Sequence, residues 1–381
     1  MSTIKVNNIT NANGTSAIAI DSSGVATFSK TLVPSSSMMY RNLIINGAMQ
    51  VAQRATIVSG QGLGGYITVD RWSTSYVNPS AVWTHSQDTD VPSGQGFGYS
   101  FKMQCTTASA VGTNERLMVG QRFEGQMLQH LKKGTANAES LTLSFWVKSN
   151  KTGTYIANLY DTDNTRQISK AYTISSADTW EKKIITFAGD TTGTLDNDNN
   201  QSFILFFGLA VGTFETSGTL QTSWGSAVGT DRFVGQVNLG DAVNNYINIT
   251  GIQLEVGDAA TPFEHRPYDA ELARCQRYYV IHNSNAVGDR LANGQGDSTS
   301  VVNFIVPVPT ILRTYPVCGF NNLVCRNGVT NVTISSLGGI NYSTTSNFVN
   351  VYFNTVSSVQ GAGYMLRATD ADGYIEFGAE L

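Results

Sequence analysis

Residues 251–279 read GIQLEVGDAATPFEHRPYDAELARCQRYY and differ from the rest of the chain, which is mostly Ser, Thr, Asn and Gly in β-type alternation. The stretch begins at the end of an alternating segment, Ile247 to Val256, which predicts a strand. Pro262 and Pro267 follow, and each fixes φ and removes a backbone donor. We therefore expect an extended, rigid loop after the strand.

A single helix is predicted after this loop, over residues 269–281. Asp269 is the expected N-cap, because a short side-chain oxygen can accept from the first free backbone N–H groups. Leu272, Cys275 and Tyr279 recur at three- and four-residue spacing and predict one apolar stripe. The helix is thus expected to join a larger β body, residues 41–268, to a smaller β unit, residues 282–381.

Two blocks of sequence resemble bacteriophage tail-fibre or receptor-binding proteins. One is LEVGDAATPFEHRPYDAELARCQRYY, and the other is RNLIINGAMQVAQR (Arg41 to Arg54) followed by TVDRW. The resemblance covers residues 41–281 and implies a jelly-roll, carbohydrate-module-like sandwich in a homotrimer on the virion. Its structural signature comprises Trp72, Pro262, Phe263, Glu264, His265, Arg266, Pro267 and Tyr268.

Composition indicates an all-β protein. The chain has 381 residues, 41% of them hydrophobic, which is enough for a substantial core, and its 37 glycines suit many turns. Charged residues make up 14%, and the net charge is −4 with no basic run longer than Lys132-Lys133. Nucleic acid is therefore not an expected partner, because phosphate contacts need clustered Lys and Arg.

The four cysteines, Cys105, Cys275, Cys318 and Cys325, are scattered and are expected to be reduced buried thiols. The N-terminal sequence lacks the apolar core of a signal peptide, and no apolar run approaches the roughly 20 residues of a membrane span. A virion protein made in the host cytoplasm fits these features, without insertion into a membrane.

Residues 1–40 are polar and too few to bury a core. Ile4, Val6 and Ile9 suggest one strand, and 17–20 and 25–28 suggest a further pair. We expect this segment to attach the protein to other phage tail or virion proteins, with Ile4, Val6 and Ile9 as the contacting residues.

Residues 41–268 are predicted to form the antiparallel jelly-roll sandwich. The nearly all-apolar run SFILFFGLA (202–210) predicts a central strand buried on both faces, and GQMLQHLKK (125–133) predicts a short helix. Residues 282–381 are expected to form a small sandwich-like β domain. The strand candidates are 48–53, 81–86, 100–105, 117–123, 141–148, 155–160, 168–174, 182–187, 203–209 and 245–256, then 301–308, 317–323, 329–335, 348–356 and 374–377.

No catalytic residues, metal site or cofactor are predicted. No G-x-S-x-G elbow surrounds a serine, and His265, one of four histidines, is expected to be a structural residue of the loop that joins the domains. The Asp161–Asn164 and Asp196–Asn200 runs offer oxygen ligands but lack the glycine and glutamate of a calcium loop, so turns are expected. Hydrolysis of a polysaccharide would need two acids in one cleft. Candidates are Asp70, Glu115, Glu124, Asp161, Glu255 and Glu264.

Exposed aromatic rings are the expected contacts for sugar, because they stack on pyranose faces. Trp224, in a loop rich in Gly, Ser and Thr, is one candidate, and Trp146 and Trp180 are expected in the core instead. In the C-terminal unit the candidates are Tyr342, Tyr352 and Tyr364. The sequence thus favours non-catalytic binding of a host surface polysaccharide or lipopolysaccharide. A purely structural fibre, neck or head-decoration protein and a polysaccharide depolymerase are the alternatives.

Overall fold

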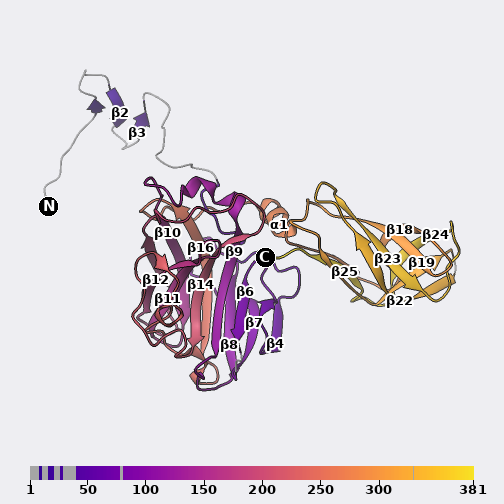
Figure 1. The fold of residues 1–381 in the computed structure, drawn as a ribbon, viewed down its shortest axis with the longest axis horizontal. Helices are drawn as coiled ribbons and strands as arrows, with labels where there is room; N and C mark the ends of the chain where they lie inside the picture. The colour runs from indigo at the N-terminus through magenta and orange to yellow at the C-terminus, as the bar shows by residue number, and fades with distance from the viewer. Residues whose placement is uncertain (1–7, 11–15, 21–25, 29–39, 78–79, 329) are drawn as a thin grey trace. The chain divides into compact units, whose positions relative to one another are not determined.

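The computed structural model describes residues 8–10, 16–20, 26–28, 40–77, 80–328 and 330–381, and the chain forms two compact units, Met1–Arg41 and Asn42–Leu381 (Figure 1). In the first unit, β1 (Asn8–Thr10), β2 (Ser16–Ile20) and β3 (Ala26–Phe28) form an antiparallel sheet in the order β1-β2-β3. Ile9 is the middle residue of β1, whereas Ile4 and Val6 lie outside the described residues.

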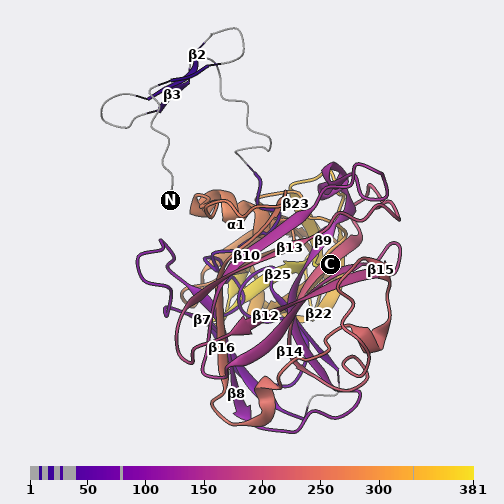
Figure 2. The ribbon, with the colours of Figure 1, turned by 90° about the vertical axis from the view of Figure 1, so that its left-hand side faces the viewer.

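The second unit begins with an antiparallel β-sandwich, as the alternating sequence predicts. Its six-stranded sheet has the order β13-β10-β16-β8-β7-β4, and its seven-stranded sheet the order β15-β12-β11-β14-β9-β6-β5. The chain crosses between the sheets repeatedly, as in a jelly roll, and Figure 2 turns this sandwich toward the viewer. The strands are β4 (Ile57–Gln61), β5 (Gly65–Tyr66), β6 (Ser73–Val77), β7 (Val82–Asp88), β8 (Ser100–Thr107), β9 (Arg116–Glu124), β10 (Leu141–Ser149), β11 (Gly153–Asp161), β12 (Arg166–Ile174), β13 (Glu181–Phe187), β14 (Gln201–Val211), β15 (Gly225–Ser226) and β16 (Tyr246–Val256).

The prediction of a doubly buried central strand is confirmed by β14. It lies between β11 and β9, and all of its residues after Gln201 are buried. Phe203, Leu205 and Phe207 point into the core between the sheets. Ile204 and Phe206 point the other way and pack in a second cluster with Phe233 and other apolar residues. The loop between β14 and β16 therefore covers the outer face of the seven-stranded sheet.

Two local predictions are wrong. Residues 48–53 are not a strand, because the chain turns where they begin: Asn46 and Met49 adopt positive φ, and the Asn46 amide donates to the carbonyls of Val51 (2.8 Å) and Asp70 (3.0 Å). Residues 125–133 form two 3₁₀ turns, η1 (Gly125–Met127) and η2 (Gln129–Leu131), because Lys132 turns into the left-handed region and ends them. Two further 3₁₀ turns are η3 (Gly229–Asp231) and η4 (Leu239–Asp241).

The predicted helix is present but shorter, spanning α1 (Tyr268–Gln276). Its N-cap is Pro267, so Asp269 lies in the first turn and is not the cap. Leu272 and Cys275 pack against the sandwich as expected, but Tyr279 already opens a strand and does not extend the stripe.

The C-terminal unit is all-β as predicted, and its strands close into a barrel rather than an open sandwich. The barrel order is β18-β19-β23-β22-β21-β24, and a separate sheet has the order β17-β25-β20. The strands are β17 (Tyr279–Asn283), β18 (Arg290–Gly296), β19 (Val301–Pro307), β20 (Val317–Asn321), β21 (Leu323–Asn327), β22 (Thr330–Asn341), β23 (Phe348–Thr355), β24 (Gly363–Ala368) and β25 (Tyr374–Gly378). The expected divisions at residues 268 and 281 lie inside the second compact unit and stay predictions.

Candidate functional site

Two of the tyrosines expected to meet a ligand belong to the barrel core. Tyr342 is 8% exposed and its hydroxyl accepts from Leu312 N (2.7 Å), and Tyr364 is 3% exposed and its hydroxyl accepts from Val359 N (2.9 Å). Both rings are therefore unavailable for stacking on a sugar, and the prediction is wrong for them. In the closed barrel, both tyrosine rings belong to the hydrophobic core of the C-terminal unit.

The other two predicted aromatics have mixed positions. Trp224 is half-buried, with its ring centroid 5.6 Å from that of Phe203 and its Nε1–H bonded to Ala188 O (2.7 Å). Its loop thus lies on the sandwich and is not the freely exposed loop that was expected. Tyr352 lies on β23 between buried Val351 and Phe353, so its half-exposed side chain points outward from the barrel. It stays a candidate contact.

Trp146 and Trp180 were expected in the core, and that prediction is wrong. Trp146 alternates with Phe145 and Val147, which are fully buried, so it lies on the outer face of the six-stranded sheet and is half-buried. Trp180 precedes β13 and is also half-buried. The alternation around Trp146 contained this information, because successive side chains of a strand point to opposite faces.

Asp90 fixes the positions of the groups around these rings. Its Oδ1 accepts from Trp180 Nε1 (2.9 Å), and its Oδ2 accepts from Lys148 Nζ (2.8 Å). Burial alone would raise the pKa of Asp90, but these two hydrogen bonds, together with the charges of Lys148 and Lys102, outweigh it and lower the pKa below its ordinary value. Asp90 is thus a carboxylate that orients one ring and one cation on the same surface.

Tyr246 extends this surface along β16. Its hydroxyl donates to Asp178 Oδ1 (2.5 Å), and Lys102 Nζ lies 5.3 Å from its ring centroid. Lys102 also pairs with Asp88 at 3.2 Å. Burial, with Asp178 as a further cause, raises the pKa of Tyr246, so its hydroxyl stays protonated and can donate.

These residues lie over the outer face of the six-stranded sheet and are together called the aromatic surface. Pairing of β10 with β16 and of β16 with β8 sets Lys148, Asn248 and Lys102 in one row across the sheet, in which Asn248 is fully buried and the two lysines are partly exposed. Flat rings beside fixed charged groups can stack on apolar sugar faces and hydrogen-bond to hydroxyls. The aromatic surface comprises Trp146, Trp180, Tyr246, Asp90, Lys102 and Lys148.

The residues of the signature stretch bind the start of the sandwich. Arg266 donates to the carbonyls of Asn42 and Ile44 (2.9 Å for Ile44), and Glu264 accepts from Asn42 N (2.9 Å). The Phe97 ring lies 5.1 Å from Phe263. The remaining signature residues are Trp72, whose Nε1–H donates to Asn46 O (3.1 Å), His265, whose ring is 5.3 Å from Phe97, and the exposed Pro262, Pro267 and Tyr268.

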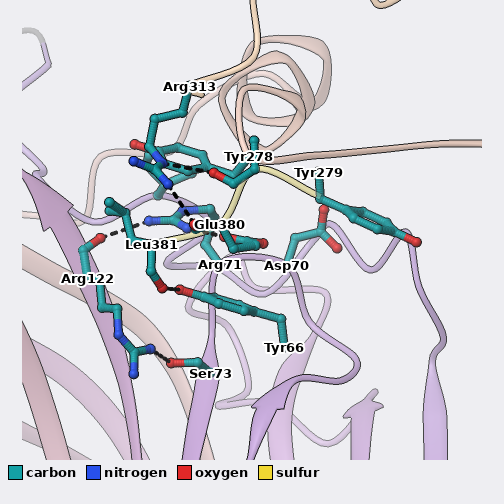
Figure 3. A network of polar contacts seen from close by, with 12 residues as sticks. Tyr66, Asp70, Arg71, Ser73, Arg122, Tyr278, Tyr279, Arg313, Glu380 and Leu381 are labelled. Atoms are coloured by element: carbon teal, nitrogen blue, oxygen red, sulfur yellow. Dashed lines mark hydrogen bonds and ion pairs between the residues drawn. The ribbon is translucent and has the colours of Figure 1, made fainter. Parts of the chain in front are cut away.

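A buried charged network lies between the sandwich and the C-terminal unit (Figure 3). Arg71, with a side chain only 1% exposed, forms an ion pair with Glu380, donates to Arg122 O (2.8 Å) and stacks over the Tyr278 ring (3.5 Å). Arg313 donates to the carbonyls of Ala379 (2.8 Å) and Glu380 (2.7 Å). Nearby, Arg277 holds the buried Glu124 (2.7 and 2.8 Å). These contacts fix the C-terminal unit to the sandwich.

The acids considered for catalysis or calcium are engaged by protein groups. Asp161 accepts from Lys133 Nζ (2.5 Å), Asp163 accepts from Asp196 N (2.9 Å), and Glu115 accepts from Ser80 Oγ (2.6 Å). In the described part of the chain, no group of three or more His, Cys, Asp or Glu side chains is arranged to hold a metal ion. Among those same residues, no helix has the length and apolar character needed to cross a membrane.

Comparison with known proteins gives only structural similarities. No protein-family model and no curated protein matches the chain. The enzymatically active domain of tailspike protein 4 from bacteriophage CBA120 is 14% identical with a TM-score of 0.32, and the match covers 57% of this chain and 22% of that one. A putative sugar binding protein from Bacteroides thetaiotaomicron is 14% identical with a TM-score of 0.33, covering 56% and 99%. A family 11 carbohydrate-binding module of a Clostridium thermocellum cellulase is 14% identical with a TM-score of 0.27, covering 55% and 99%.

Proposed function

We propose that this protein is an external fibre component of a phage virion that binds host surface glycans without cleaving them. The aromatic surface carries the proposal. It sets the partly exposed rings of Trp146, Trp180 and Tyr246 over the outer face of one sheet, beside the ion pair of Asp90 with Lys148. The ligand class is a host polysaccharide or lipopolysaccharide. An extended face suits a long chain, which is gripped through several weak contacts rather than in one deep pocket.

The resemblance of residues 41–281 to tail-fibre proteins supports a place on the virion. In the proposal, residues 1–40 attach to another virion protein and three copies form the fibre. Binding by three copies multiplies weak contacts through avidity. Sizing of the purified full chain should give about three times the 41.0 kDa of one copy. A particle of the monomer's mass would contradict the trimer and leave the binding proposal to be judged by itself.

The binding test uses intact host cells and purified surface polysaccharide with the wild-type protein and single variants. An aromatic ring contributes about 0.5–1.5 kcal/mol beyond area burial, which is about a 2- to 12-fold change in affinity. We expect losses of that order or larger for Trp146→Ala and Trp180→Ala. Tyr315→Ala is the control, because it removes an exposed ring from the C-terminal unit, far along the chain from the aromatic surface.

Each other result has a definite meaning. A loss confined to Trp224→Ala or Tyr352→Ala moves the site to those residues and refutes the aromatic surface. Binding accompanied by release of reducing ends makes the protein a depolymerase. No binding to cells or polysaccharide by the wild-type protein leaves a purely structural virion role.

A further inference from the structure

The three-stranded sheet β17-β25-β20 has one buried face and one partly exposed face. Val280, Ile375 and Phe377 are buried and belong to the barrel core. The alternate residues form the other face, on which Arg54 covers the Tyr279 ring, and the strand register arranges them in three rows. These rows are Tyr279-Gly378-Val317, Ile281-Glu376-Gly319 and Asn283-Tyr374-Asn321.

An open cleft with a volume of about 780 Å³ lies over this face. Arg54 and Tyr66 line it from the sandwich side, and Asn285 and Asp372 line it from loops of the C-terminal unit. The volume is within the roughly 300–1,000 Å³ of small-ligand sites. The Tyr279 ring, which points away from the Arg71–Glu380 pair in Figure 3, is also part of the lining.

Two glycines of the sheet, Gly378 and Gly319, leave space in the cleft next to the carboxylate of Glu376. A Cβ built at Gly378 meets only Val317 O at 3.9 Å, so the space above this residue is open. A Cβ built at Gly319 would lie 2.6 Å from Glu376 Oε1, so the carboxylate occupies the space that this glycine leaves. Tyr279 donates to the other oxygen, Oε2, and thereby fixes the carboxylate.

The electrostatic balance of the cleft favours a ligand without negative charge. Arg54 contributes one positive charge to the lining, and its guanidinium shares Glu380 (3.2 Å) with Arg71 and stacks on the Tyr279 ring (3.5 Å). Glu376 and Asp372 add negative charge. Burial, and then the charges of these two acids, raise the pKa of Tyr374.

The row Asn283-Tyr374-Asn321 supplies the other groups that a sugar needs. An aromatic ring flanked by two amides can stack on one face of a pyranose while the amides donate to and accept from its hydroxyls. Glu376 can accept hydrogen bonds from further hydroxyls. A neutral hexose matches this set, whereas a polyanionic chain would be repelled.

We propose that this cleft is a second saccharide site, which takes a neutral, hexose-containing glycan over Tyr374 and Glu376. It is independent of the aromatic surface and lies on a different sheet. One protein would therefore contact a glycan at two separate places, and loss of either site leaves the other.

The test is an array of neutral, amino and acidic oligosaccharides probed with the full-length protein. Gly378→Leu fills the open space above the sheet, and Tyr374→Ala removes the stacking ring. We expect each to weaken binding to neutral oligosaccharides at least about tenfold, while Trp180→Ala leaves that binding in place. Gly363→Leu is the matched control, because Gly363 is an exposed barrel glycine with no atom within 4 Å of an added Cβ and lies outside the cleft.

Glu376→Gln keeps the shape of the floor and removes its charge, and it should weaken neutral binding without destroying the fold. Thermal unfolding midpoints like that of the wild type show that each variant is folded. The proposal fails if no neutral oligosaccharide binds, if Gly378→Leu binds like Gly363→Leu, or if the cleft prefers acidic sugars. Loss in Trp180→Ala alone refutes the cleft and retains the aromatic surface.

Discussion

Removing the carboxylate of Glu380 should destabilise the protein far more than removing an exposed one. Glu380 forms the ion pair with Arg71, whose side chain is 1% exposed, and also accepts from Arg54 (3.2 Å). Glu380→Ala leaves the Arg71 charge buried without its partner, which typically costs about 3–5 kcal/mol. The bond to Arg122 O (2.8 Å) and the stacking on Tyr278 remain, so we expect the lower end, about 3 kcal/mol.

Urea unfolding monitored by tryptophan fluorescence measures this loss in the free energy of unfolding, and calorimetry gives a second measurement of it. Glu139→Ala is the matched control, because Glu139 pairs with Lys132 at the surface, where the two side chains are 36% and 54% exposed. An exposed pair contributes at most about 1 kcal/mol. Replacing both charged partners, as in Arg71→Met with Glu380→Leu, should recover much of the loss, since the Arg71 charge is then no longer buried without a partner, although Arg54, 16% exposed, still lacks Glu380.

The reasoning is refuted if Glu380→Ala and Glu139→Ala lose the same small free energy of unfolding. It is also refuted if the double variant is less stable than Glu380→Ala, because the cost would then come from packing rather than from an uncompensated charge.

Two further predictions concern buried titratable groups. Burial lowers the pKa of His85 to about 4 from its ordinary 6.5, so the folded protein binds fewer protons than the unfolded chain between these values. The contribution of His85 to stability is therefore full above pH 6.5 and falls by up to about 3 kcal/mol as the pH drops to 4. His85→Gln should flatten this pH dependence of the free energy of unfolding, measured by urea titration. An unchanged slope against pH would contradict the assignment to His85. Burial also raises the pKa of Cys318 and Cys325 to about 12, and that of Cys105 and Cys275 as well. A disulfide reagent at pH 8 should thus label the native thiols slowly, with half-buried Cys318 first, and all four in denaturant; rapid labelling of native Cys275 would contradict this.

The sequence predicted elements whose signal is local. The run 202–210 is apolar at nearly every position, so both sets of alternating side chains are apolar. It forms the strand that is buried on both faces. The turn at 46–51 was missed because it depends on hydrogen bonds from the Asn46 amide to Val51 O and to Asp70 O, the latter 24 residues along the chain. The strand RLANGQG (290–296) was missed because it has few β-branched or aromatic residues and is held by its barrel neighbours.

The sequence predicted the type of residue in the candidate site but not most of the residues themselves. Aromatic residues were expected, but Tyr342 and Tyr364 face inward, and this depends on pairings that close the barrel over long separations. Trp146 was within reach, since strict alternation with Phe145 and Val147 assigns it to the outer face. The cleft was not, because it combines strands about 100 residues apart whose register no local pattern specifies.

The C-terminal unit is tied to the sandwich at two points of its chain. The chain enters through Tyr279 in β17 and returns through β25, and these strands pair directly, with Tyr279 opposite Gly378. Just beyond β25, Glu380 contacts Arg54 and Arg71 of the sandwich. A pull on the barrel is thus shared between two strands instead of a single covalent tether. The paired strands also oppose rotation of the barrel about a single connection. A force applied by a ligand bound to the barrel would therefore be transmitted to the sandwich through two paired strands, and the connection would extend little under load.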